Sequence, residues 1–262
     1  GNKAIWMQDS SKNANTGKLV VAEGAFILSV YLDVTPGSTE WPVEVSVAAS
    51  SLTDSSENKG IYTDGIPAGY EVVLDNGVYT VRYTCAAKIG DVEYPSLQAA
   101  VEAVKDGETI VLNRDIEQVD GVIITDKNIT IDLGGKTFTV TNGANTNNRN
   151  FKVNGSSVVT IKNGTMVATG TISTGAYGTV RTEGTAMVTL DNVKSYSYRG
   201  YGLNIKACTD TKIIINNSEI YAQYSGGVEA AGGEIELNNV KIVQNGVDSS
   251  GAWCSIRQLS DE

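Results

Sequence analysis

The sequence contains no histidine among its 262 residues. Histidine is the commonest general base and metal ligand in proteins, so its absence excludes serine–histidine and cysteine–histidine catalysis and every histidine-ligated metal centre. Carboxylate, lysine and arginine chemistry stays open. The sequence therefore favours a non-enzymatic role without excluding an enzyme, and we assign no catalytic residue and no metal ligand.

Other scarcities exclude further classes of protein. The three cysteines, Cys85, Cys208 and Cys254, are widely spaced and form no CxxC pair, so each is predicted to be a buried, unreactive thiol. Only 20 basic residues face 30 acidic ones, and the resulting net charge of -10 argues against a nucleic-acid partner. No apolar run approaches the roughly 18 residues that cross a bilayer, so no membrane span is expected within this sequence.

Proline and charged residues are also scarce, whereas glycine is frequent, with 28 residues. This composition is typical of a rigid β-protein with many turns rather than of a disordered chain. No signal peptide is visible, and we interpret the abrupt start at Gly1 as the scar of a replaced leader. We expect a secreted or cell-surface protein whose signal segment, and any lipid or wall anchor, lies outside this sequence.

The first part of the chain has an all-β pattern. Apolar runs at residues 25–34 and 41–49 predict strands. Asn76-Gly77 lies between two alternating segments, a strong hairpin signal because both residues tolerate positive φ. We interpret residues 1–86 as a small β-sandwich-like module; the alternative is that they extend the second part.

One helix is predicted, over residues 95–105. Ser96 is its expected N-cap and Gly107 its expected C′ residue. The expected buried face recurs at helical spacing and consists of Leu97, Ala100, Val101 and Val104.

After residue 108 the sequence repeats itself. Five segments alternate aliphatic and polar residues, and their central anchors are Ile131, Ile161, Leu190, Ile215 and Leu237. The anchors are separated by 30, 29, 25 and 22 residues, a drifting period typical of stacked coils. A second short strand follows each anchor and a third precedes most of them, so each coil is predicted to hold three strands with aliphatic inward residues.

An asparagine occupies the same position after four of the anchors. These residues are Asn163, Asn192, Asn217 and Asn239. Asparagine tolerates the left-handed conformation, and in stacked coils its amide can bond to the asparagine of the next coil, which predicts an asparagine ladder. A leucine-rich repeat is the rival solenoid, but its LxxLxL consensus is absent; an ordinary β-sandwich is the remaining alternative.

Three segments carry a family resemblance: AKIGDVEYPSLQAAV at residues 87–101, KDGETIVL at 105–112 and DKNITIDLGGKT at 126–137. They resemble the right-handed β-helix of the pectin-lyase-like superfamily, and look similar to repeat domains in large surface proteins of host-associated bacteria. The resemblance implies a β-helix over residues 87–262 whose leading helix caps the open end and so shields an exposed strand edge. The expected fold class is all-β: a right-handed, single-stranded parallel β-helix with an N-terminal capping helix, preceded by the small module.

The superfamily includes lyases and hydrolases of acidic polysaccharides, which makes such an enzyme the alternative function. The paired-aspartate and Gly-His-Gly motifs of polygalacturonases are absent. Calcium-dependent pectate lyases use an aspartate cluster and an arginine; the residues nearest to that arrangement are Glu183, Glu229, Arg181 and Arg199, and no acidic triplet recurs between coils. We expect no cofactor, and calcium only under this alternative.

Tyrosine-rich turns recur at residues 176–178, 196–202 and 221–226. Coils stacked about 4.8 Å apart would join them into a stripe flanked by polar residues of the adjoining strands. Flat aromatic rings with hydrogen-bonding side chains fit the C–H faces and hydroxyls of sugars. The candidate glycan-binding residues are Tyr177, Arg181, Glu183, Tyr198, Arg199, Tyr201, Asn204, Lys206, Tyr224 and Glu229.

The predicted function is therefore that of a non-enzymatic, adhesin-like extracellular protein whose tyrosine-rich face contacts host or dietary glycans or other cell-surface partners. A second alternative, besides the polysaccharide lyase or hydrolase, is a rigid structural spacer without a ligand. In that case the tyrosines only cover the coil and support its turns.

Overall fold

The computed structural model describes residues 5–8, 18–25, 27, 29–33, 44–53, 60–66, 69–141, 149–169, 178–198, 202–205, 210–223, 226–244 and 256–259. The chain divides into two compact units, Gly1–Cys85 and Ala86–Glu262. Within the described residues, no helix combines the length and the apolar character that crossing a membrane requires.

The first unit contains two sheets. Three parallel strands form one of them: β1 (Ile5–Gln8), β3 (Val30–Asp33) and β5 (Ile61–Gly65). The other has the order β2 (Lys18–Val21), β4 (Glu44–Ala48), β7 (Val78–Tyr83) and β6 (Tyr70–Asp75), and the 3-10 helix η1 (Ala49–Ser51) follows β4. Residues of both sheets, including Val30, Leu32, Val45 and Val47, share one core.

The pairing in this unit is mostly parallel, which the sequence did not predict. Successive strands alternate between the two sheets, and Ile5 pairs with Val30 in one sheet while Lys18 pairs with Glu44 in the other. The chain therefore coils here as well, and a parallel bridge between Ile27 and Leu52 continues the coil. The antiparallel hairpin of β6 and β7 is confirmed, with positive φ at both residues of Asn76-Gly77.

The second unit opens with an antiparallel hairpin of β8 (Ala87–Ile89) and β9 (Val92–Tyr94), followed by α1 (Leu97–Ala103) and β10 (Thr109–Leu112). Ser96 caps α1 as predicted, because its hydroxyl accepts a hydrogen bond from the Ala99 N–H at 3.1 Å. The helix is shorter than residues 95–105, and Gly107 is not its C′ residue. Val104 already has extended backbone angles, so Gly107, with φ +84°, belongs to the later turn before β10.

The apolar face of α1 is buried as predicted, at Leu97, Ala100 and Val101, and Val104 continues it. The helix contacts β8, β9, β10 and β12 (Val122–Thr125), and its apolar residues belong to the same core as the coils. Its role as a cap that excludes a further strand stays a prediction.

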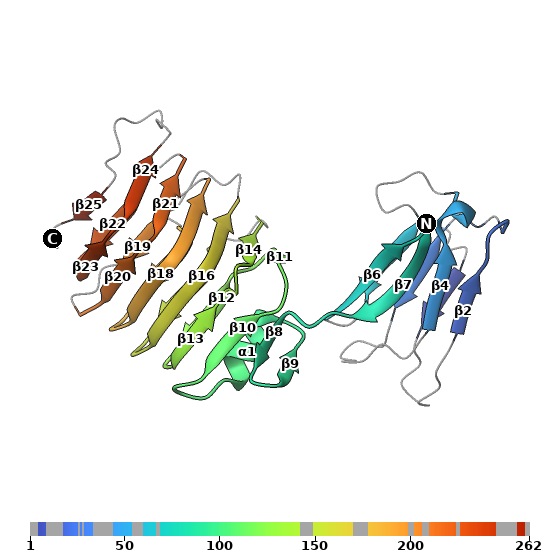
Figure 1. Cartoon of the computed structure of the whole chain (residues 1–262), viewed down its shortest axis with the longest axis horizontal. Coiled ribbons are helices and arrows are strands. Elements are labelled where there is room, and N and C mark those ends of the chain that lie inside the picture. The colour runs from blue at the N-terminus through green and yellow to red at the C-terminus, as the bar shows by residue number, and fades with distance from the viewer. Residues whose placement is uncertain are drawn as a thin grey trace. The chain divides into compact units, whose positions relative to one another are not determined.

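The predicted parallel β-helix is confirmed, with about seven turns. Figure 1 shows its strands side by side from β10 to β23. The remaining strands, in chain order, are β11 (Ile116–Gln118), β13 (Asn128–Asp132), β14 (Thr137–Val140), β15 (Phe151–Asn154), β16 (Val158–Ala168), β17 (Val180–Thr182), β18 (Met187–Ser197), β19 (Leu203–Ile205), β20 (Lys212–Asn216), β21 (Glu219–Ala222), β22 (Val228–Ala231), β23 (Glu234–Asn238), β24 (Lys241–Gln244) and β25 (Ile256–Leu259).

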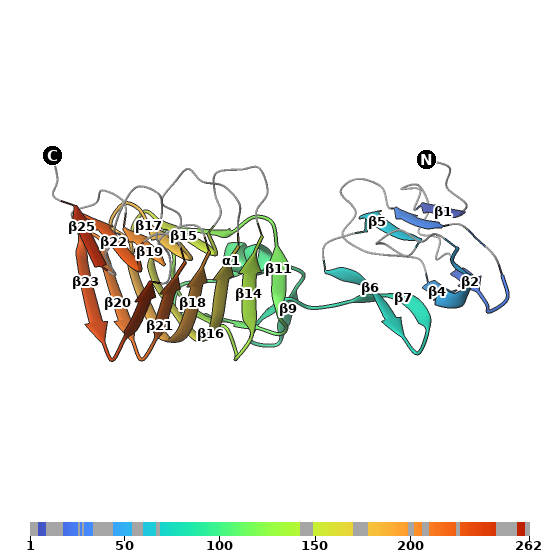
Figure 2. The same cartoon turned by 90° about the horizontal axis from the view of Figure 1, so that it is seen from above.

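The coils build two sheets that enclose one core. One sheet is six-stranded, with the order β12-β15-β17-β19-β22-β25. The other is twelve-stranded and has two arms, because its longest strands, β16 and β18, bend at Asn163 and Asn192. The first arm holds β10, β13, β20, β23 and the first halves of β16 and β18, and the second arm holds β11, β14, β21, β24 and their second halves. Figure 2 shows the six-stranded sheet on the side of the coil opposite the second arm.

The five predicted anchors form one column. Parallel pairing aligns each anchor with the next one along the chain. The aligned series is Ile131, Ile161, Leu190, Ile215 and Leu237. The first four are 0 % exposed, and burial of each such side chain contributes roughly 1.5–3 kcal/mol. This column sets the register of every coil, and with it the positions of the outward side chains.

Candidate functional site

The bend between the two arms is made by the repeated asparagines. Asn163, Asn192, Asn217 and Asn239 all have positive φ, between 49° and 58°. The left-handed conformation predicted for this position is therefore confirmed. At the first of these bends the next residue, Gly164, also approaches the neighbouring coil closely, because a Cβ there would lie 2.4 Å from Leu133 Cβ.

The asparagine side chains form a ladder in two segments. Asn192 Nδ2 donates to Asn163 Oδ1 at 3.2 Å, and Asn239 Nδ2 donates to Asn217 Oδ1 at 3.1 Å. Between the segments, Asn217 donates instead to the Asp191 carboxylate at 3.2 Å. A carboxylate is a stronger acceptor than an amide oxygen, which accounts for the break.

The outward residues of the second arm form two cross-strand rows, because inward residues such as Phe138, Met166 and Ile220 alternate with them. One row contains Thr137, Thr165, Lys194, Glu219 and Lys241. The other contains Thr139, Val167, Tyr196, Tyr221 and Val243. We call these rows, together with Tyr198 and Gln223 beyond the strand ends, the second-arm face.

Two tyrosines stack at the centre of this face. The rings of Tyr196 and Tyr221 are nearly parallel, at 6°, with centroids 4.7 Å apart, which matches the spacing of successive strands. The Tyr221 hydroxyl donates to the Glu219 carboxylate, and Lys241 Nζ lies 5.6 Å from the centroid of the Tyr221 ring. Tyr221 is therefore held at its hydroxyl by Glu219 and on one ring face by Lys241.

Electrostatics at this face follow from the Tyr221–Glu219 hydrogen bond. That bond is the main reason why the pKa of Glu219 is lowered, and the positive charges of Lys194 and Lys241 lower it further. The same bond raises the pKa of Tyr221. Lys194 Nζ lies 3.7 Å from Glu219, so the charge of this lysine is balanced by a neighbouring carboxylate.

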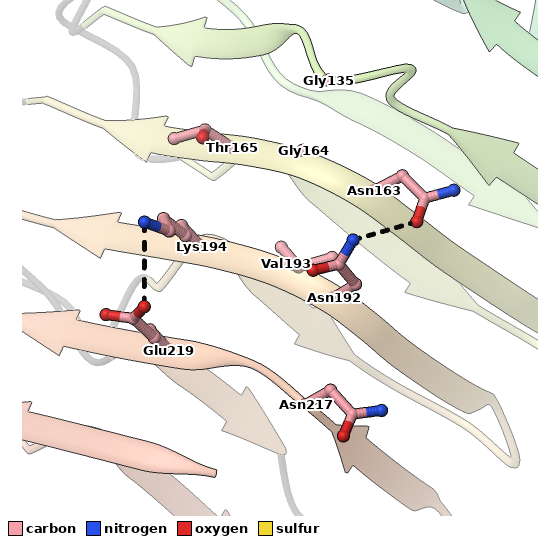
Figure 3. Close-up of a pocket in the computed structure, with 9 residues that line it drawn as sticks. All are labelled: Gly135, Asn163, Gly164, Thr165, Asn192, Val193, Lys194, Asn217 and Glu219. Carbon is pink, nitrogen blue, oxygen red and sulfur yellow. Dashed lines mark hydrogen bonds and ion pairs between the residues drawn. The ribbon is translucent and has the colours of Figure 1, made fainter. Parts of the chain in front are cut away.

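Two hollows lie side by side on the face, each of about 410 Å³. The asparagine hollow is lined by Gly135, Asn163, Gly164, Thr165, Asn192, Val193, Lys194, Asn217 and Glu219. Figure 3 shows its asparagines in one line, with Thr165, Lys194 and Glu219 in a second line beside them. The tyrosine hollow is lined by Tyr196, Ser197, Tyr198, Tyr221, Ala222 and Gln223.

Of the predicted binding residues, Tyr198 lies at this face. It follows the last residue of β18 and is 47 % exposed. Its N–H donates to the Ala168 carbonyl at 3.0 Å, as the N–H of Thr169 one coil earlier donates to Val140. Tyr198 is therefore held in the register of the coils at the mouth of the tyrosine hollow.

Four other predicted residues lie elsewhere, on the six-stranded sheet. Arg181, Asn204 and Glu229 form one cross-strand row and are nearly buried, at 8 %, 5 % and 6 % exposure. Asn204 Nδ2 donates to Glu229 at 3.0 Å, and Glu183 pairs with Arg181 at 2.8 Å and with Lys152 at 3.1 Å. These side chains thus form a polar network on a different sheet from Tyr196 and Tyr221.

The other predicted positions lie outside the described residues. They are Tyr177, Arg199, Tyr201, Lys206 and Tyr224, together with the cysteines Cys208 and Cys254. Cys85 is buried, as predicted.

Sequence reasoning did not include the two stacked tyrosines among the binding residues. It expected Tyr196 and Tyr221 at the ends of short second strands, where tyrosine-rich turns begin, and they do lie within β18 and β21. A signal was present: each of the two tyrosines follows its anchor, Leu190 or Ile215, by six residues.

Side chains able to bind a metal do not gather at this face: among the described residues, no group of three or more cysteines, aspartates and glutamates is arranged to hold an ion. The fold defines the chain as a parallel β-solenoid protein. Comparison with protein-family models, curated proteins and solved structures gives no match. The functional inference therefore depends on the geometry of the second-arm face.

Proposed function

We propose that this protein is an extracellular, adhesin-like surface protein that binds carbohydrate without catalysis, through the second-arm face. The observation that carries the proposal is the cluster of Tyr196, Tyr198 and Tyr221 around one hollow. The resemblance of the segments at 87–101, 105–112 and 126–137 to pectin-lyase-like repeat domains of bacterial surface proteins supports the surface location.

The chemistry of the tyrosine hollow suits a sugar. Tyr198 supplies exposed aromatic surface for the C–H face of a pyranose ring, and the Gln223 amide can both donate to and accept from hydroxyl groups. The stacked pair covers one face of each ring, so Tyr196 and Tyr221 contribute mainly ring edges. The volume of about 410 Å³ is within the range of small-ligand sites.

The backbone beneath the hollow favours binding because it is already ordered. β18 is paired on both sides, with β16 and with β20 and β21. The N–H of Gln223 donates to the Ser197 carbonyl at 2.9 Å, so this turn is held as well. A ligand that docks here immobilises few side chains, which lowers the entropic cost of binding.

A glycan array probed with the full chain tests the proposal. We expect selective binding that Tyr198→Ala weakens by roughly tenfold or more, since the most exposed aromatic contact with the ligand is lost. Thr169→Ala, at the equivalent position one coil earlier, is the matched control and should bind as the wild type does. Equal binding by wild type and Tyr198→Ala would contradict the proposal.

The same glycans distinguish the alternatives. Release of unsaturated or reducing ends from pectins or glycosaminoglycans, with or without added calcium, would replace the proposal by a lyase or hydrolase. No retention of any glycan would favour a rigid spacer. In that case the Tyr198→Ala variant would leave every measured interaction unchanged.

A further inference from the structure

We infer that the ligand is an uncharged oligosaccharide that lies along the strands and occupies both hollows. This inference rests on the proposed function and adds the ligand's charge, its direction and a second subsite. The asparagine hollow would then take part in recognition, although its side chains also form the bend of the coil.

The two hollows are neighbours along the same strands. Lys194 and Glu219 line the asparagine hollow, and the next outward residues on the same strands, Tyr196 and Tyr221, line the tyrosine hollow. Along β18 the distance from Asn192 to Tyr198 is at most about 20 Å, at roughly 3.3 Å per residue. A chain of several sugar rings laid along β18 and β21 would therefore contact both hollows at once.

The asparagine hollow has the polar groups that hydroxyls need. Asn163, Asn192 and Asn217 bring amides, each able to donate and accept, and Thr165 adds a hydroxyl. Figure 3 shows these side chains arranged along the hollow from coil to coil. Because sugar hydroxyls also donate and accept, a surface of amides and hydroxyls matches them better than a surface of donors alone.

The charges of the hollow argue against an acidic ligand. The single cation, Lys194, is 3.7 Å from the Glu219 carboxylate, so the lining carries no net charge. The hydrogen bond from Tyr221 lowers the pKa of Glu219, so this carboxylate stays ionised at neutral pH. With a net charge of -10 on the chain, a uronate or sulfate group would meet repulsion here.

The test measures affinity, by calorimetry on the full chain, for neutral gluco-, xylo- and manno-oligosaccharides and for galacturonate and hyaluronan oligosaccharides. Each series runs from disaccharide to hexasaccharide. We expect affinity for one neutral series to rise roughly tenfold with length, as hydrogen bonds in the second hollow are added. Binding should be insensitive to salt, because no charge pair forms.

Thr165→Trp would fill the asparagine hollow. It should remove the gain with length, so that the hexasaccharide binds only as tightly as the disaccharide, and leave the disaccharide unaffected. The matched control is Thr137→Trp, in the same row one coil earlier and outside the hollow's lining. If thermal unfolding shows that Thr165→Trp does not fold, Thr165→Arg, with a flexible side chain, provides the same block.

The outcomes separate this inference from the proposed function. Tighter, salt-dependent binding of an acidic series, or a length dependence that survives Thr165→Trp, overturns the inference while binding through Tyr198 stands. Failure of every oligosaccharide to bind overturns both.

Discussion

The second-arm face has two halves built on the same backbone. On β14 and β16 the outward rows carry Thr137, Thr139, Thr165 and Val167; on β18 and β21 they carry Lys194, Tyr196, Glu219 and Tyr221. The strand register is continuous, and the inward residues of both halves are buried. The inward columns therefore hold the frame, while the outward residues differ from coil to coil on the same backbone.

The largest effect is expected from breaking the frame that both halves share. Leu190→Ala removes a fully buried anchor between Ile161 and Ile215 and should lower the free energy of unfolding by about 2–5 kcal/mol. Urea unfolding measures this loss. Val158→Ala, at an outward position of β16 that is 43 % exposed, is the control, with a change within about 0.5 kcal/mol. Equal losses for the two variants would refute the distinction between inward and outward positions.

A smaller effect is expected at the bend between the two arms, where a ladder bond links the two halves. Asn192 has φ 54° and donates to Asn163 across the boundary between β16 and β18. Asn192→Ala should destabilise the protein by about 1–2 kcal/mol, because alanine is disfavoured in the left-handed conformation. Asn192→Gly keeps that conformation and loses only the side-chain hydrogen bond, so thermal unfolding should show a smaller loss. Equal losses for the two variants would show that the ladder bond, which both remove, matters more than the left-handed backbone.

The outward chemistry itself is tested by exchanging side chains at one row position. Tyr196→Ala removes the ring stacked on Tyr221, which should reduce stability by about 0.5–1.5 kcal/mol beyond the lost burial and weaken glycan binding. Val167→Ala, the residue paired with Tyr196 in the preceding coil, should leave binding unchanged. Glycan-array binding of the two variants measures the difference. Similar losses of binding in both would contradict a functional difference between the halves.

The smallest effect concerns proton binding, which distinguishes the halves because the Thr137, Thr139, Thr165 and Val167 positions cannot titrate. The hydrogen bond from the Tyr221 hydroxyl to the Glu219 carboxylate forms when Glu219 is ionised and Tyr221 is protonated. Since the pKa of Glu219 is lowered on folding, its contribution is complete above the unfolded-state pKa and is lost as pH falls through the folded one. Since the pKa of Tyr221 is raised, that contribution is lost only as pH rises through the raised value.

Glu219→Gln should return the Tyr221 titration toward the ordinary value of about 10. Near-ultraviolet difference absorbance, with Tyr221→Phe subtracted to isolate this one tyrosine, measures the shift. An unchanged Tyr221 titration in Glu219→Gln would show that the hydrogen bond does not control it.

Much of the solenoid could be predicted because its signals are local or periodic. The anchors recur with the coil, Ser96 stands at the start of a helical pattern, and Asn76-Gly77 marks a hairpin by its own conformational preference. The parallel coil of the first unit was not predicted. Its partners, such as Ile5 and Val30, lie about one coil apart but share no repeated motif that would show the pairing.

The candidate site was predicted only in part. Tyr198 lies at the proposed face, but Arg181, Asn204 and Glu229 form a nearly buried row on another sheet. Strand alternation predicted that these side chains point outward, but it did not predict their low exposure, which depends on the residues packed around them. Alternation describes one strand at a time and holds no information about neighbouring layers.

The sequence alone determined the coil: an aliphatic anchor in each repeat buries one column, and after four of the five anchors an asparagine two residues later takes the left-handed bend. Only the tertiary structure decided which outward residues meet. The stack of Tyr196 on Tyr221 and the turn of Asn217 toward Asp191 both join residues about 25 positions apart. Such contacts depend on register and turn length, which are set when the coils stack and not by the residues of either strand.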